Sequence, residues 1–204
     1  ALALCSGQDL PASLAQTFSE QELKNLDHLR TQPHLCPLTS SVGRLFDGVS
    51  ALLGLCQTVS FEGQAAMALA AQVDEALPSA PYPFDLEGPG PQLVQWRPML
   101  QAILQDLQNG ASVTEIATRF HHTLVAIIVA VAQGQEIPQI VLGGGCFQNR
   151  FLLEQSIIGL RQAGFEVYWP RLVPPNDGGL ALGQLWALHY RQGPALTKHP
   201  PEGQ

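Results

Sequence analysis

Hydrophobic residues recur every three or four positions over most of the first two thirds of the chain, the spacing of one face of an α-helix. Ser19 is followed three residues later by Glu22, and Ser112 by Glu115, and each pair is a capping box that opens a helix. The predicted helices cover about residues 19–30, 41–54, 61–74, 98–108 and 112–133. Between them, residues 77–91 hold five prolines and two glycines and predict a long surface loop or a hairpin.

After Pro138 the pattern changes to short apolar runs separated by glycine turns and amphipathic stretches. The predicted order is strand 139–142, turn 143–145, helix 149–163, strand 165–169 and helix 177–190. This is a βαβα unit with a parallel pair of strands, so the chain is of the α/β class. We expect a mainly helical subdomain over 1–136, a nucleotide-binding βαβα unit over 137–190 and a flexible tail over 191–204.

Composition narrows the classes of partner. Seventeen acidic against ten basic residues give a net charge of −7, which disfavours nucleic acid as a partner. The longest apolar run has nine residues, whereas a membrane-spanning helix needs about 20, so we expect no membrane partner. Four scattered cysteines without CxxC spacing favour a cytoplasmic location. Because the chain starts at Ala1 without a secretion signal, we also expect a fragment of a larger domain.

The glycine-rich turn is the first candidate site. Gly143, Gly144 and Gly145 stand between a predicted strand and a predicted helix and are followed by Asn149. Backbone without side chains lets an anion or a nucleotide approach closely, although a plain tight turn explains the pattern equally well. The spacing matches neither GxxxxGK[ST] nor GxGxxG, so no standard nucleotide fingerprint is present.

A second turn follows the next predicted strand, where Asp177 precedes Gly178 and Gly179. Asp177 is interpreted either as the N-cap of the last helix or as a hard oxygen ligand for a metal. Parallel topology places both turns at one edge of the sheet, and this favours a nucleotide site there.

The start of the second predicted helix supplies a third candidate. Asp47 lies four residues after Gly43 and is predicted to face a ligand held at that helix end. The alternative, an exposed acid beside a solvated Arg44, is disfavoured because the flanking residues are apolar and a buried Asp needs a partner.

Two features contain residue types that can bind metals or act as nucleophiles, but a purely structural role is the preferred interpretation of both. His121 and His122 are adjacent, so on a helix they point about 100° apart and cannot face one ion together. Cys146 has no partner His that the sequence places, so a small packing residue is the preferred interpretation.

Four blocks in order, TSSVGRLFDGVSALLGL, SFEGQAAMALA, IVLGGGCFQNRFLL and PPNDGGLALGQ, resemble the C-terminal part of the hydrogenase maturation carbamoyltransferases, the HypF family. That region is similar to the Kae1-like proteins of the actin/sugar-kinase/Hsp70 (ASKHA) superfamily, whose halves are ribonuclease-H-like. The resemblance therefore implies one such half with a large helical portion.

The resemblance also implies roles for residues of this chain. The adenosine-binding loop of the family matches Gly143, Gly144, Gly145 and Asn149, and the residues that meet the ribose match Gly43 and Asp47. The positions beside the nucleotide match Glu62 and Gly63, and a metal ligand matches Asp177. The sequence departs from full-length members in lacking their zinc-finger segments, acylphosphatase-like domain and histidine-rich metal motif.

The implied reaction uses ATP and carbamoyl phosphate to form a carbamoyl-adenylate with release of AMP on transfer, and the carbamoyl group passes to the C-terminal cysteine of HypE. The implied metal is a divalent Zn or Fe ion, with an incomplete ligand set here, so we expect this chain to be inactive by itself. Two alternatives stay open, namely a non-catalytic nucleotide-binding or interaction module and a tRNA threonylcarbamoyladenosine-type enzyme.

Overall fold

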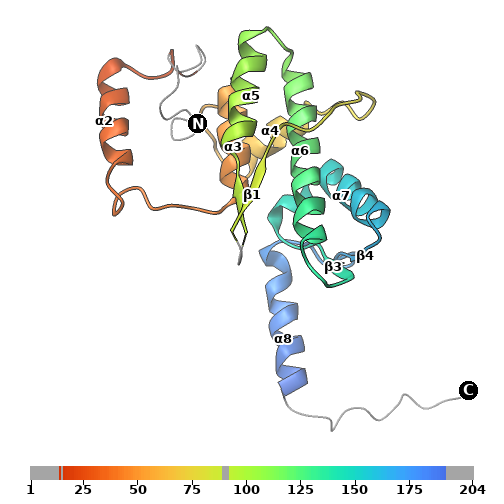
Figure 1. Ribbon diagram of the computed structural model, residues 1–204. Helices are drawn as coiled ribbons and strands as arrows, with labels where there is room; N and C mark the ends of the chain where they lie inside the picture. Colours follow the sequence, from red (N-terminus) through yellow and green to blue (C-terminus); the bar gives the residue numbers. More distant parts are fainter. Residues whose placement is uncertain (1–13, 15, 89–91, 192–204) are drawn as a thin grey trace, which may run out of the picture.

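The computed structural model describes residue 14, residues 16–88 and residues 92–191 (Figure 1). The helices are α2 (Glu20–Arg30), α3 (Val42–Leu52), α4 (Gln64–Ala70), α5 (Arg97–Gln108), α6 (Val113–Gln133), α7 (Arg150–Gln162) and α8 (Leu180–Arg191). The strands are β1 (Asp85–Glu87), β2 (Leu93–Gln95), β3 (Gln139–Val141) and β4 (Glu166–Tyr168), and the short 3-10 turns are η1 (Gly145–Gln148) and η2 (Asp177–Gly179). Of the tail predicted over 191–204, Arg191 is the last residue of α8, and residues 192–204 lie outside the described residues.

Both predicted capping boxes are confirmed. The Ser19 and Ser112 side chains accept hydrogen bonds from the backbone N–H groups of Glu22 and Glu115, whose carboxylates bond back to the caps. Ser41 precedes α3 but makes no capping bond with its side chain.

The predicted helix 61–74 is too long in both directions. Gly63 has a φ of +83°, which belongs to the left-handed region, so the helical backbone begins only at Gln64. The helix ends at Ala70, and the chain then turns so that the Asp74 N–H donates to the Thr118 hydroxyl on α6. The true α4 has seven residues.

Helix α6 is the centre of the core. Its Ile116, Phe120 and Leu124 are buried and pack with Phe46 of α3 and Met99 of α5. In the described part of the chain, α6 is also the one helix whose length and composition would let it cross a membrane. Because its buried residues are engaged with α3, α5 and α7, its apolar character is explained by this packing.

The C-terminal unit is built on two parallel strands. Strands β3 and β4 pair with Ile140 opposite Val167, and α7 connects them, as predicted. Leu160 and Val167 are buried together with Leu142 at the end of β3 and Ala132 from α6. The strands are therefore covered by α7 and by the end of α6, and the glycine turn after β3 lies where α6, α7 and α3 approach one another.

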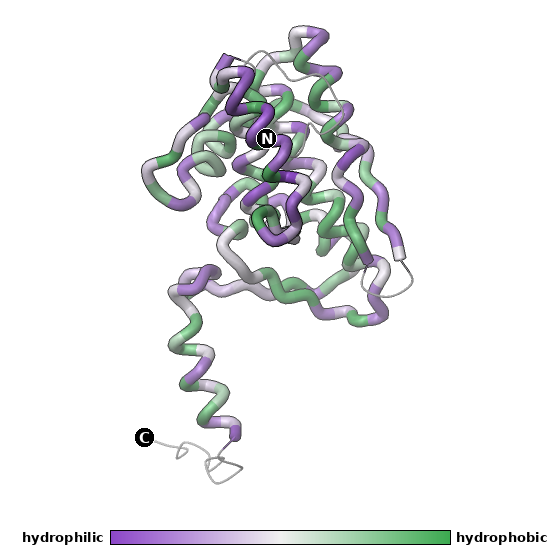
Figure 2. Tube along the Cα trace, turned by 90° about the vertical axis from the view of Figure 1, so that its left-hand side faces the viewer, coloured by the Kyte–Doolittle hydropathy of each residue, from purple (hydrophilic) through white to green (hydrophobic). Residues whose placement is uncertain are grey.

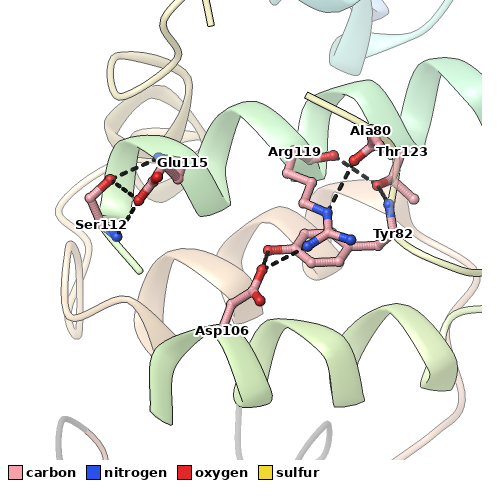
Figure 3. Close-up of polar contacts among 7 residues, drawn as sticks. All are labelled: Ala80, Tyr82, Asp106, Ser112, Glu115, Arg119 and Thr123. Atoms are coloured by element: carbon pink, nitrogen blue, oxygen red, sulfur yellow. Dashed lines mark hydrogen bonds and ion pairs between the residues drawn. The ribbon is translucent and has the colours of Figure 1, made fainter. Parts of the chain in front are cut away.

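The proline-rich stretch forms the β1–β2 hairpin and, before it, a segment fastened to the core by polar contacts (Figure 3). Tyr82 is 1% exposed, its hydroxyl donates to the Asp106 carboxylate over 2.7 Å, and its N–H donates to the Thr123 hydroxyl. Arg119 bonds the same carboxylate over 3.0 Å, bonds the Ala80 carbonyl and stacks 4.1 Å from the Tyr82 ring. These contacts join the segment to α5 and α6.

Helix α8 projects away from the rest of the chain (Figures 1 and 2). It has no buried residue, and Leu182, Leu185 and Trp186 are 53%, 65% and 63% exposed. These residues are three or four apart, so they form one apolar stripe. The stripe is the kind of surface that folded proteins cover by packing.

Candidate functional site

The glycine turn after β3 presents bare, open backbone. Gly143, Gly144 and Gly145 are exposed, and a Cβ added to any of them would have no atom within 4 Å. Gly144 has a φ of +107° and a ψ of 159°, a conformation that is essentially restricted to glycine. The space above the turn is therefore free for a ligand, and no contact within the described chain explains why all three side chains are missing.

The two turns meet at one edge of the sheet, as predicted. The Gly144 N–H donates to the Pro175 carbonyl oxygen over 2.7 Å. That N–H is consequently occupied, and one of the donors that the sequence offered for an anion is not available. The second turn differs from the first, because a Cβ on Gly178 would come within 2.9 Å of Pro174. Close packing inside the turn is enough to require that glycine.

The interpretation of Asp177 as a helix N-cap is wrong. The cap is Asn176, whose side-chain oxygen accepts the Gly178 N–H over 3.0 Å, and the final helix begins with the 3-10 turn η2 before α8. Because the Asn176 side chain makes this capping bond, the exposed Asp177 carboxylate has no capping role. Among the described residues no group of three His, Cys, Asp or Glu side chains could hold a metal ion. One carboxylate is an incomplete ligand set, so a metal centre that included Asp177 would need further ligands from another part of a HypF-like protein.

The start of α3 carries Gly43 and Asp47 next to the glycine turn. Asp47 is half-buried and pairs with Arg44 over 2.9 Å, and because the Arg44 side chain is 60% exposed this ion pair lies at the surface. Helix α3 contacts both η1 and α4. Helix α3, which carries Gly43 and Asp47, is thus a neighbour of η1 at the end of the glycine turn. Gly63 and the exposed Glu62 lie just before α4, which contacts α3.

His121 links α6 to this turn, a contact that no sequence pattern indicated beyond the presence of a histidine on an apolar helix face. Its Nδ1 lies 2.7 Å from the Ala117 carbonyl oxygen, which only accepts hydrogen bonds, so Nδ1 carries the proton. Its Nε2 then accepts from the Asn149 side-chain amide over 2.8 Å. Burial lowers the pKa of His121 to about 4 and keeps the ring neutral at physiological pH.

Cys146 is half-buried among apolar residues of the core. Burial raises the pKa of the Cys146 thiol, which opposes the thiolate that a nucleophile requires. The packing interpretation of this cysteine is the one that the structure supports.

Comparison with known proteins decides the family. Residues 1–184 match the model described as "Carbamoyltransferase, Kae1-like Domain, second subdomain". The chain belongs to the HypF carbamoyltransferase family. It is 48% identical to the Carbamoyltransferase HypF of Synechocystis over 165 residues, covering 80% of this chain and 21% of that protein. It is 40% identical to the HypF of Rhizobium leguminosarum bv. viciae over 157 residues, covering 72% and 19%.

The fold agrees with the family. A crystal structure of full-length HypF "in the phosphate- and nucleotide-bound form" superposes with a TM-score of 0.80 and 32% identity, covering 88% of this chain and 24% of that one. The HypF of T. kodakarensis, at 21% identity and a TM-score of 0.65, shares the fold. The predicted α/β class is confirmed, and the chain spans about a fifth of the length of the curated HypF proteins cited above.

Proposed function

We propose that this chain supplies the adenosine-side wall of a carbamoyl-transfer site. The observation that carries the proposal is the open, exposed backbone of Gly143, Gly144 and Gly145 beside α3. The relative whose structure contains nucleotide has the same fold over 88% of this chain, which supports an adenine nucleotide, ATP or AMP, as the ligand. In this proposal the Asp47 carboxylate, on the neighbouring helix and paired with Arg44, meets the ribose hydroxyls.

The proposed chemistry is acyl transfer from a carbamoyl-adenylate. A cysteine thiolate of a HypE-like partner attacks the carbonyl carbon, a C–S bond forms, and the C–O bond to the phosphate breaks so that AMP leaves with the electron pair. Holding the adenosine fixes the carbonyl carbon in place for the thiolate, which lowers the entropic cost of the encounter. This chain contributes that positioning, and its described residues offer no complete metal site to assist it.

The rest of the site belongs, in this proposal, to the remaining part of a HypF-like protein, which also handles carbamoyl phosphate in the cytoplasm. The apolar stripe of Leu182, Leu185 and Trp186 on α8 is a surface for that part to cover. Burying such side chains contributes roughly 1.5–3 kcal/mol each, so the stripe can hold the two parts together.

Reconstitution tests the proposal. Synechocystis HypF without the segment that matches this chain is mixed with this chain, ATP, carbamoyl phosphate and a HypE-like protein, and carbamoylation of the C-terminal cysteine is followed by intact mass. The excised Synechocystis segment, supplied as a separate chain, is the positive control. We expect this chain to restore transfer and Trp186→Ser to weaken it, whereas Leu38→Ser, on a distant and fully exposed loop position, has no effect. Restoration by the Synechocystis segment but not by this chain contradicts the proposal.

A further inference from the structure

His121 lies under the glycine turn with its side chain fully buried. The rings of Phe46, Phe120 and Phe151 meet it edge to face, with centroids 5.4, 5.6 and 5.9 Å away. A polar ring in such surroundings needs partners for both nitrogens. It has them in the Ala117 carbonyl oxygen and the Asn149 amide.

The hydrogen bonds of Asn149 fix which way its amide points. Its Oδ1 accepts the Leu152 N–H over 3.1 Å and caps α7, and its Nδ2 donates to Nε2 of His121. Turning the amide by 180° would set two acceptors against each other at His121 and two donors against each other at Leu152. Both bonds would be lost, so a single orientation is stable.

One hydrogen of the Asn149 amide remains after these bonds. Among the described residues no other partner for Nδ2 is present, and Asn149 is half-buried at the surface that follows the glycine turn. The amide therefore bridges a buried imidazole and the surface where the proposed nucleotide lies.

We infer that His121 is a positioning residue of the nucleotide site: its Nε2 holds the Asn149 amide so that the second Nδ2 hydrogen is presented to an acceptor atom of the adenosine. The inference rests on the proposed function. Helix α6 thereby acts on the ligand without touching it. Phe46, which packs on the same imidazole, precedes Asp47, so His121 also sits between the two elements proposed to hold the nucleoside.

A purely structural His121 would be replaceable by any ring that fills the same volume. His121→Phe keeps the aromatic packing and removes the acceptor, while His121→Gln keeps an acceptor oxygen in place of Nε2. Thr118→Val is the matched control, because Thr118 is also fully buried on α6 but bonds the Asp74 N–H. If His121→Phe fails to fold, His121→Met, which adapts to irregular apolar surroundings, takes its place.

Calorimetric titration with AMP and amide NMR of the full chain test the inference together. We expect His121→Phe to weaken AMP binding about tenfold, the loss of one oriented hydrogen bond, and to move the Asn149 Nδ2 hydrogen signals towards the positions of a solvent-exposed asparagine. His121→Gln and Thr118→Val should bind within about threefold of the unsubstituted chain.

Unchanged AMP affinity in His121→Phe overturns the inference and leaves the proposed function standing. Absence of AMP binding by the unsubstituted chain overturns the proposed function, and the ligand part of the inference with it. The NMR signals then still report whether His121 orders the Asn149 amide, so the two failures are distinguishable.

Discussion

The Gly144 N–H donates to the Pro175 carbonyl oxygen over 2.7 Å, and this bond ties together the two turns at the edge of the parallel strands. It fixes Gly144 at a φ of +107°, a conformation that other residues rarely adopt. The open surface of the first turn is therefore held in place by the second.

Gly144→Val should abolish nucleotide binding while the chain stays folded. The branched side chain would fill the open space above the turn and add about 1–3 kcal/mol of backbone strain. Calorimetry with AMP and circular dichroism measure the two effects. Gly110→Val is the control, since Gly110 also has a positive φ, of +79°, but lies between α5 and α6. Equal loss of binding in both variants would mean that general destabilisation, not blockage of the turn, is the cause.

Tyr82→Phe should destabilise the fold by about 1–2 kcal/mol, because a buried hydroxyl that bonds a carboxylate is removed. The Asp106 carboxylate keeps Arg119, so the loss is partial. Urea unfolding would show a lower midpoint at unchanged slope. Tyr168→Phe is the control, as its hydroxyl bonds Glu166 at the surface, and it should change stability by no more than about 0.5 kcal/mol. An equal loss in both variants would contradict the role given to the Tyr82 contacts.

The free energy of unfolding should fall as the pH drops from about 6.5 towards 4. Burial lowers the pKa of His121 from 6.5 to about 4 in the folded chain, so the unfolded chain binds more protons over this range. The contribution is complete above pH 6.5 and about 3 kcal/mol of it is lost by pH 4. Urea midpoints measured across this range should fall less steeply in His121→Gln. Identical slopes in both chains would show that His121 is not neutral in the fold.

Asp177→Asn should leave the melting temperature of this chain unchanged, since Asn176 caps the turn and Asp177 is exposed. In the reconstituted enzyme, the same substitution should reduce carbamoyl transfer strongly, because a hard cation loses one charged ligand. Thermal unfolding and the mass assay separate the outcomes. Normal transfer would remove Asp177 from the proposed site.

Short-range sequence patterns predicted most of the helices, strands and turns. The capping boxes of Ser19 and Ser112 and the glycine turn between β3 and α7 are short-range patterns, and each lies where it was predicted. The cap at Asn176 was missed because Asn and Asp are adjacent there and cap about equally well.

The long-range contacts of the site could not be predicted in this way. His121 and Asn149 are 28 residues apart, and Tyr82 and Asp106 are 24 apart, so their pairing depends on how the helices pack. Hydrophobic periodicity marks the buried face of α6 but carries no information on which buried polar residue meets which partner. The sequence therefore indicated the elements of the site, and the structure added the contacts that connect them.

Titration of this chain with AMP and with ATP is the most direct test of the claim that it supplies the adenosine-side wall. We expect both nucleotides to bind with similar affinity, because the exposed turn of Gly143, Gly144 and Gly145 meets the nucleoside that they share. Absence of binding would contradict the claim, since the open turn would then have no nucleotide ligand. A strong preference for ATP over AMP would also contradict it, since such a preference requires contacts to the β- and γ-phosphates.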